Sequence, residues 1–260
     1  FRSDNVIVDF KYSASEKLTW WFDHHQSAFL SESDEQHFRQ DRSGRKFHDP
    51  TFKSCTKFID HVARDTFGFE NPALKDLVYW ADIIDGAQFP SAQMAVELKE
   101  PAMKLMLVIE ANREKRLIHK IIRLMQRESL ENVLKDDEVR AAYEGLNRQH
   151  VSSIGLMRDR ARCTDGVVEF DVSDQQIDSY NKFIPYYLFP EAVYCVGVSQ
   201  SAIRAKVSVG TNPWSPRERM HNLAKLCEQY GGGGHAVVAA LHAPLRVHAS
   251  ASLARIKLRE

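Results

Sequence analysis

The sequence predicts an α/β protein in which a helical linker joins two domains, and three patterns along its 260 residues lead to this prediction. Two short apolar runs near the N-terminus each stop at an acidic residue, helical periodicity dominates the middle of the chain, and strand-like runs return in the second half. The expected divisions are a parallel-sheet domain over 1–128, a helical linker over 129–150 and a smaller α/β domain over 151–260.

The two N-terminal runs are predicted strands of one open sheet. Val6–Val8 is β-branched, is expected to be a buried strand and stops at Asp9, and Leu18–Phe22 stops at Asp23. Functional groups of an open α/β sheet gather beyond the carboxyl ends of its strands, so both acids are expected at one edge. Residues 31–50 are polar and predict a mobile surface loop.

Helices are predicted next. The apolar residues between positions 58 and 63 are spaced for one helix face, and the stretch 95–128 carries one long helical periodicity. The strongly charged stretch 129–150 follows and is the candidate linker helix.

The second half predicts mostly strands. They are expected over 167–170, 192–198 and 204–209, with a strand or short helix over 237–241. Ser215 and Glu218 form a capping box around Pro216, which predicts a helix from about Pro216 to about Tyr230.

The composition excludes some classes of protein. Lys plus Arg and Asp plus Glu both number 35, so no basic field exists for coating long duplex DNA by counterion release. A small anionic substrate needs only a local positive cluster or bound metal ions. No CxxC pair and no apolar run near the ~20 residues of a membrane span occur, and no secretory signal is expected. These features predict a cytoplasmic protein with reduced cysteines and no membrane partner.

Asp23-His24-His25, directly after an apolar run, is a candidate metal site. Carboxylate and imidazole groups are ligands for divalent transition metals, and adjacent histidines point in different directions. One can therefore bind metal while the other reaches a substrate. The alternative is a polar strand terminus. Asp9 is a candidate ligand from the neighbouring strand, or else it caps the turn over 11–15.

Asp82 and Asp85 stand beside Gly86 in an otherwise apolar stretch. Because unpaired buried carboxylates are costly, metal ligation would explain them, and a helix cap is the alternative.

Four glycines, Gly231 to Gly234, precede His235. Successive glycine N–H groups can converge on an anion without obstruction, and a histidine can add a hydrogen bond to a phosphate. The alternative is a cap after the predicted helix, although one glycine would be enough for that.

Asp23-His24-His25 and Gly231 to His235, about two hundred residues apart, resemble the two signatures of the DHH/DHHA1 phosphoesterases. That family includes nanoRNA and cyclic-dinucleotide-product phosphodiesterases, RecJ-type exonucleases and family II inorganic pyrophosphatases. The resemblance spans nearly the whole chain and implies a DHH domain followed by a DHHA1 domain. The family's first motif, a His-x-Asp-x-Asp-like cluster, is absent from these residues, so the DHH domain is expected to be N-terminally incomplete.

The resemblance assigns roles in the DHH domain. Asp9 and His24 match metal ligands, His25 matches a phosphate-contacting catalytic residue, and Asp23 would orient both histidines from behind. Two divalent metal ions are implied, with Mn²⁺ as the expected ion.

The stretch Asp85 to Phe89 resembles the family's Asp-Thr-Gly-x-Phe motif. Asp85 is therefore the expected third metal ligand, and Asp82 is the second choice.

In the DHHA1 domain the resemblance implies a set of residues that grip the substrate. They are Arg204, Ser208, Asn212, Gly232, Gly233, Gly234 and His235. The family's Ser-Phe-Arg-Ser reads Ser208 to Thr211 here, so Arg204 or Lys206 would replace its arginine.

The expected function is metal-dependent hydrolysis of phosphodiester bonds in short oligonucleotides or dinucleotides. One alternative is a phosphatase for a small molecule such as a nucleoside bisphosphate or pyrophosphate. Another is a nucleotide-binding module without catalysis. The sequence does not decide whether the chain forms a homo-oligomer.

Overall fold

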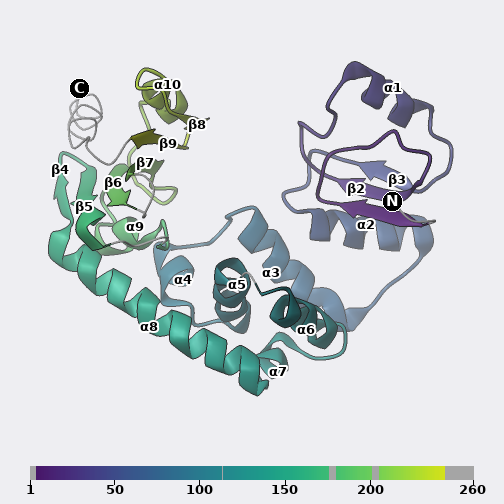
Figure 1. Cartoon of the computed structure of the whole chain (residues 1–260), viewed down its shortest axis with the longest axis horizontal. Coiled ribbons are helices and arrows are strands. Elements are labelled where there is room, and N and C mark those ends of the chain that lie inside the picture. The colour runs from purple at the N-terminus through teal and green to yellow at the C-terminus, as the bar shows by residue number, and fades with distance from the viewer. Residues whose placement is uncertain (1–3, 113, 176–179, 201–204, 244–260) are drawn as a thin grey trace. The chain divides into compact units, whose positions relative to one another are not determined.

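A computed structural model of the chain describes residues 4–112, 114–175, 180–200 and 205–243 (Figure 1). The chain divides into two compact units, one formed by Phe1–Phe89 with His119–Leu134 and the other by Pro90–Ile118 with Lys135–Glu260. This division differs from the predicted one, because residues 90–118 group with the second half and 129–150 is no separate body.

A three-stranded parallel sheet forms the centre of the first unit. Its strands, in spatial order, are β1 (Asn5–Val8), β2 (Leu18–Asp23) and β3 (Lys46–His48). The first two confirm the predicted strands. However, β1 lies at the edge of this sheet, where Val6 and Val8 stay 60% and 50% exposed. The expectation of a buried strand was therefore wrong for that face.

The segment 31–50 is not the predicted loop, since it forms helix α1 (Glu32–Gln40) and strand β3. Ser31 caps α1 by accepting a hydrogen bond from the Asp34 N–H. No residue of α1 is fully buried, and β3 has only three residues. Both elements therefore lack the apolar period on which a sequence prediction depends.

Aromatic side chains fill one face of this sheet. Trp21 is fully buried there, with the Tyr12 ring 4.8 Å away and the Phe38 ring of α1 5.2 Å away.

Helix α2 (Cys55–Phe67) follows β3 and begins where the Ser54 side chain accepts a hydrogen bond from the Lys57 N–H.

A partly buried ion pair stabilises the β3 side of the first unit. Lys46 Nζ lies 2.9 Å from Asp41 Oδ2 and also donates to the Tyr12 hydroxyl at 3.3 Å. Burial alone would raise the pKa of Asp41, but hydrogen bonds from Ser43 and Lys46 outweigh it and hold that pKa below its usual value. The Asp41 carboxylate thus stabilises the fold above its unfolded pKa and stops doing so as the pH falls through its lowered folded pKa.

We expect Lys46→Met to destabilise the protein by about 1–3 kcal/mol at pH 7, since the Asp41 carboxylate loses its charged donor. Denaturant unfolding at a series of pH values measures this loss, which should shrink once the pH falls below the lowered pKa of Asp41. Lys53→Met, at an exposed lysine, is the matched control. Equal effects of the two substitutions would contradict the prediction.

A run of helices follows between residues 72 and 160. They are the 3₁₀ turn Pro72–Leu74, α3 (Lys75–Asp85), α4 (Ala92–Glu97), α5 (Pro101–Ala111), α6 (Lys115–Met125), α7 (Leu130–Lys135) and α8 (Asp137–Arg160). The single periodicity over 95–128 is thus divided into three helices. The first break falls at Leu98, which has φ 48°, and at Pro101, which opens α5.

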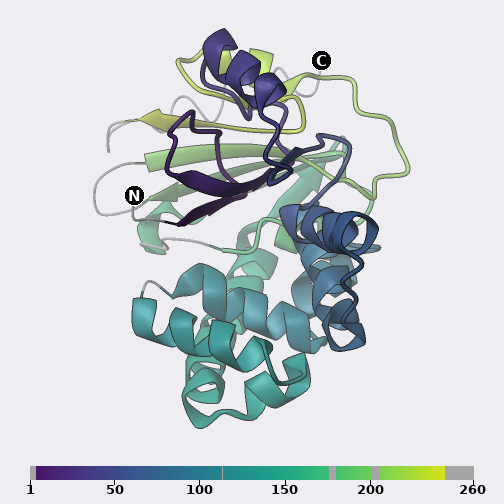
Figure 2. The ribbon, with the colours of Figure 1, turned by 90° about the vertical axis from the view of Figure 1, so that its right-hand side faces the viewer.

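The second unit contains a six-stranded mixed sheet (green arrows in Figure 2). In spatial order its strands are β4 (Arg162–Thr164), β5 (Val167–Asp171), β6 (Tyr194–Gln200), β7 (Ala205–Thr211), β9 (Val238–Ala243) and β8 (Gly233–His235). They confirm the strands predicted over 167–170 and 192–198, and of the two alternatives for 237–241, a strand or a short helix, the structure has a strand from Val238. Helices α8 and α9 (Ile184–Leu188) pack on one face, and α10 (Leu223–Glu228) packs on the other.

Helix α10 is much shorter than the helix predicted from Pro216 to Tyr230. The Asn222 side chain caps it instead of Ser215. The Tyr194 hydroxyl accepts hydrogen bonds from the N–H groups of Met220 and His221, which holds the preceding segment out of the helix. Tertiary contact therefore overrides the capping-box pattern. Among the described residues, no helix is long and apolar enough to cross a membrane.

Candidate metal centre and glycine-rich hairpin

The candidate metal centre is built at the carboxyl ends of β1 and β2. Strand β2 ends in Asp23, and His24 and His25 follow it directly. The Asp9 N–H donates to the Phe22 carbonyl at 2.9 Å, which extends the pairing of β1 with β2 by one residue. Asp9 then turns the chain with φ 55°, a left-handed conformation that aspartate adopts more readily than most residues. Parallel pairing thus places Asp9 beside His24.

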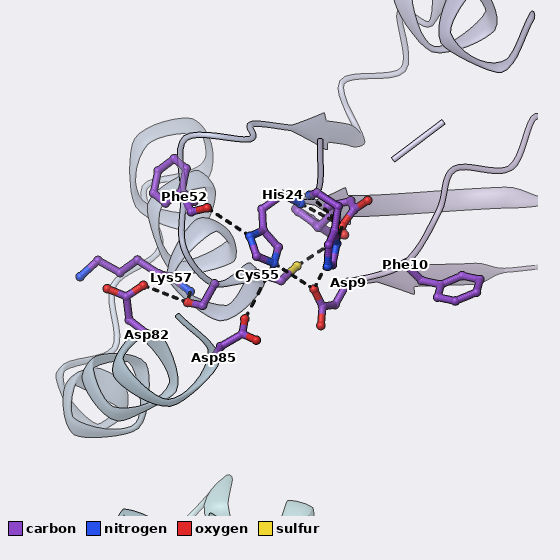
Figure 3. Close-up of polar contacts among 12 residues, drawn as sticks. Asp9, Phe10, His24, Phe52, Cys55, Lys57, Asp82 and Asp85 are labelled. Atoms are coloured by element: carbon purple, nitrogen blue, oxygen red, sulfur yellow. Dashed lines mark hydrogen bonds and ion pairs between the residues drawn. The ribbon is translucent and has the colours of Figure 1, made fainter. Parts of the chain in front are cut away.

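Three side chains converge at this edge as the sequence predicted (Figure 3). His24 Nε2 lies 3.2 Å from Asp9 Oδ1 and 3.8 Å from Asp85 Oδ2. Asp9, His24 and His25 each offer a ligand atom, and these atoms lie within 4.8 Å of one another. Among the described residues, the predicted ligands Asp9, His24 and Asp85 thus lie close together, and His25 lies beside them.

The ring orientation of His24 suits it to metal binding. Its Nδ1 lies 3.1 Å from the Phe52 carbonyl, which can only accept, so Nδ1 carries the proton. Nε2 is thereby directed toward the carboxylates of Asp9 and Asp85. In the form of the ring that leaves Nε2 unprotonated, its lone pair and the two carboxylates can all be ligands of a divalent cation. These residues therefore fit a metal ion.

Asp23 forms hydrogen bonds with both histidines. Its fully buried carboxylate accepts through Oδ1 from the His24 N–H at 2.9 Å and from His25 Nδ1 at 2.7 Å. The hydrogen bond to Asp23 raises the pKa of His25 against the opposing effect of burial, and the charges of Asp23, Asp9 and Asp85 raise it further. Because Nδ1 is engaged, Nε2 of His25 is the atom that remains for an anionic substrate.

Asp85 and Asp82, both on α3, have different surroundings. Burial raises the pKa of Asp85, and the nearby Asp9 carboxylate raises it further. A cation would relieve this repulsion. Asp82 Oδ1 instead accepts a hydrogen bond from Ser54 Oγ at 3.2 Å, next to the start of α2. The geometry thus agrees with the choice of Asp85 over Asp82.

Two further groups at this site escaped the sequence prediction. The first is the Phe52 carbonyl. Every residue has a main-chain carbonyl, so the residue type could not identify this one. The second is Cys55, whose thiol contacts the Phe22 carbonyl at 3.5 Å and whose pKa is raised by burial to about 12. It is therefore a neutral thiol beside the acids.

The four glycines of the second unit do two different things. The N–H groups of Gly231 and Gly232 donate to the carbonyls of Glu228 and Cys227, which is the helix cap that the sequence left as an alternative. Gly233 and Gly234 continue into β8 and pair with β9. The run is thus a cap followed by a hairpin strand.

Gly234 needs to be glycine, whereas Gly233 does not. A Cβ atom at Gly234, where φ is 149°, would lie 2.5 Å from the Val238 carbonyl oxygen, and at Gly233 it would meet nothing within 4 Å. We expect Gly234→Ala to destabilise the protein by about 1–3 kcal/mol and Gly233→Ala to stay within about 1 kcal/mol of wild type. Denaturant unfolding of the two variants checks this, and equal stability would contradict it.

Ser208 and His235 share one face of the second sheet. Ser208 pairs with Ala240, which pairs with Gly233, and His235 lies two residues beyond Gly233. Partners across a sheet and residues two apart along a strand point to the same side. The His235 side chain is exposed there.

The other predicted substrate residues are placed differently. The amide of Asn212 is buried and donates to the carbonyls of Pro190 and Ala192, while its oxygen accepts from the Trp214 N–H. These contacts give Asn212 a structural role in its loop. Arg204 lies outside the described residues.

No protein-family model and no curated protein matches the chain, but solved structures match its fold. A pGpG-specific phosphodiesterase, PggH from Vibrio cholerae, is 17% identical and has a TM-score of 0.77, with 97% of this chain and 82% of that chain covered. The DHH domain of a member of a ribosomal protein family is 14% identical with a TM-score of 0.51, covering 97% of this chain and 68% of that chain.

Proposed function

We propose that this chain, which has the fold of the DHH phosphoesterases, hydrolyses phosphodiester bonds in short oligonucleotides or dinucleotides with the help of divalent metal ions. The observation that carries the proposal is the convergence of His24 Nε2 with the carboxylates of Asp9 and Asp85. An imidazole nitrogen and two carboxylates can hold a divalent cation, and metal-assisted hydrolysis uses such a site.

Each residue of the site has a task in this proposal. Asp9, His24 and Asp85 would hold the metal ions, for which we propose Mn²⁺, the ion that the resemblance to the DHH/DHHA1 phosphoesterases implies. When bound, these ions would neutralise phosphoryl charge and ease the deprotonation of the attacking water. Asp23 orients His25, whose raised pKa favours a protonated ring that donates to a phosphoryl oxygen.

The second unit carries further residues to which we assign substrate binding. We assign this task to the sheet face that carries Ser208, Gly233 and His235, because it combines a hydroxyl and an exposed imidazole with glycines that leave room for a ligand. Arg204 and the neighbouring Gly232 and Gly234 complete the proposed set.

A dinucleotide is the substrate that we favour. The phosphodiesterase with the similar fold acts on pGpG, and the chain has no excess of basic residues for long nucleic acids. The free cysteines favour a reducing compartment, and we place the reaction in the cytoplasm.

Turnover of a dinucleotide, a longer oligonucleotide and pyrophosphate in Mn²⁺ buffer, each with an EDTA control, tests the proposal. We expect the dinucleotide to be hydrolysed fastest, and EDTA to abolish the reaction because the acceptor cluster then lacks its cation. Preference for pyrophosphate would instead indicate a phosphatase. Binding of a dinucleotide without turnover would indicate a nucleotide-binding module, and the hydrolase proposal would fail.

A further inference from the structure

His48 contacts the main chain of the candidate metal centre, although it is neither a proposed ligand nor a proposed catalytic residue. It is the last residue of β3, where it pairs with Asp23 of β2. Its Nε2 lies 2.8 Å from the main-chain carbonyl oxygen of His25. A carbonyl only accepts, so Nε2 carries the proton and donates it. The same carbonyl also accepts a hydrogen bond from the Ala28 N–H at 3.2 Å.

Aromatic rings hold the His48 side chain in place. It is stacked on Trp21 with ring centroids 5.7 Å apart and an interplanar angle of 19°. The rings of Phe29 and Phe38 meet it edge-on at 5.3 Å and 6.3 Å. Since Trp21 is fully buried, the imidazole is supported by the core of the first unit. Its N–H is therefore directed at the His25 carbonyl by packing on several sides.

His25 is thereby held at both ends. Its ring Nδ1 donates to Asp23, and its carbonyl accepts from His48. The side chain between these points is half exposed, and it is otherwise contacted by the carboxylate of Asp9 at 3.8 Å and by the His24 ring, with centroids 4.6 Å apart. Small displacements of a catalytic group cost large factors in rate. The main-chain anchor and the ring anchor together set where Nε2 of His25 lies.

We infer that His48 is a positioning residue that fixes His25 for the reaction by hydrogen-bonding the His25 carbonyl. The inference rests on the proposed function. It predicts that loss of the His48 donor lowers kcat, with little effect on KM, and that it does so only while the His25 ring is present.

Kinetic comparison of four variants, His48→Phe, His48→Gln, His25→Ala and the double variant His25→Ala/His48→Phe, tests the inference. His48→Phe keeps the aromatic packing but removes the donor, and we expect kcat to fall by about 10–100-fold with KM within about twofold. His48→Gln keeps an N–H donor and should recover most of this loss. In a His25→Ala background, His48→Phe should change the residual kcat by less than about twofold.

A merely structural role gives a different pattern. If His48→Phe lowers the rate by the same factor with and without His25, or leaves kcat unchanged while His25 is present, the inference is wrong. Failure of His48→Gln to recover activity in a folded protein would also contradict it.

A measurement without substrate separates this inference from the proposed function. Imidazole ¹H–¹⁵N NMR of the metal-free protein should show a protected His48 Nε2–H, and His48→Phe should shift and broaden the His25 ring signals. His221, in the second unit, serves as the internal control. Unchanged His25 signals overturn the inference. A wild type that hydrolyses none of the substrates but shows these NMR changes overturns only the proposed function.

Discussion

We expect replacement of His24 by alanine to lower the proposed Mn²⁺-dependent dinucleotide hydrolysis by at least about 10³-fold, because the metal would lose the proposed ligand that contacts both Asp9 and Asp85. Nε2 is 3.2 Å from the Asp9 carboxylate, and the ring is already oriented by the Phe52 carbonyl. The substitution leaves two carboxylates facing each other without the imidazole.

Steady-state kinetics at saturating Mn²⁺ measure this effect, and titration with Mn²⁺ should show weaker binding. His119→Ala, at an exposed histidine on α6, is the matched control and should keep the wild-type rate. Thermal unfolding checks that both variants fold. A folded His24→Ala protein with wild-type turnover would refute the role of His24.

We expect replacement of Asp23 by alanine to lower both the stability of the protein and the rate of the proposed hydrolysis. The Asp23 carboxylate is fully buried and accepts from the His24 N–H and from His25 Nδ1. Its loss leaves these donors without their acceptor, for a cost of about 2–4 kcal/mol. It also frees the His25 ring, so kcat should fall by about 10²-fold or more.

Asp23→Asn is the matched variant, since an amide oxygen can still accept from His25 but carries no charge. We expect it to be more stable than Asp23→Ala and to have an intermediate kcat. Denaturant unfolding and kinetics of both variants provide the test. An Asp23→Ala protein with the wild-type kcat would show that Asp23 does not position His25.

The proximity of Asp9 to His24 was predictable from the sequence because it depends on two neighbouring strands. Asp9 and Asp23 each follow a short apolar run, and parallel pairing of two such runs places the acids at one edge. Asp85 needed the family resemblance, because from its own surroundings Asp82 was an equal candidate.

Features that depend on distant contacts were not predictable. Residues 90–118 belong with the second unit because α5 packs against α8, which lies beyond α6 and α7 in the chain. The helix expected from Pro216 is shortened by the hydroxyl of Tyr194, far away in the sequence. Likewise, only the three-dimensional structure brings His48 to the His25 carbonyl.

Anomalous X-ray diffraction at the manganese edge, from crystals of the protein soaked in Mn²⁺, tests whether Asp9, His24 and Asp85 bind a metal ion. We expect an anomalous peak bonded to His24 Nε2 and to carboxylate oxygens of Asp9 and Asp85, and its absence from crystals of the His24→Ala variant. Density without a peak between these three residues at saturating Mn²⁺ would show that they do not form a metal site.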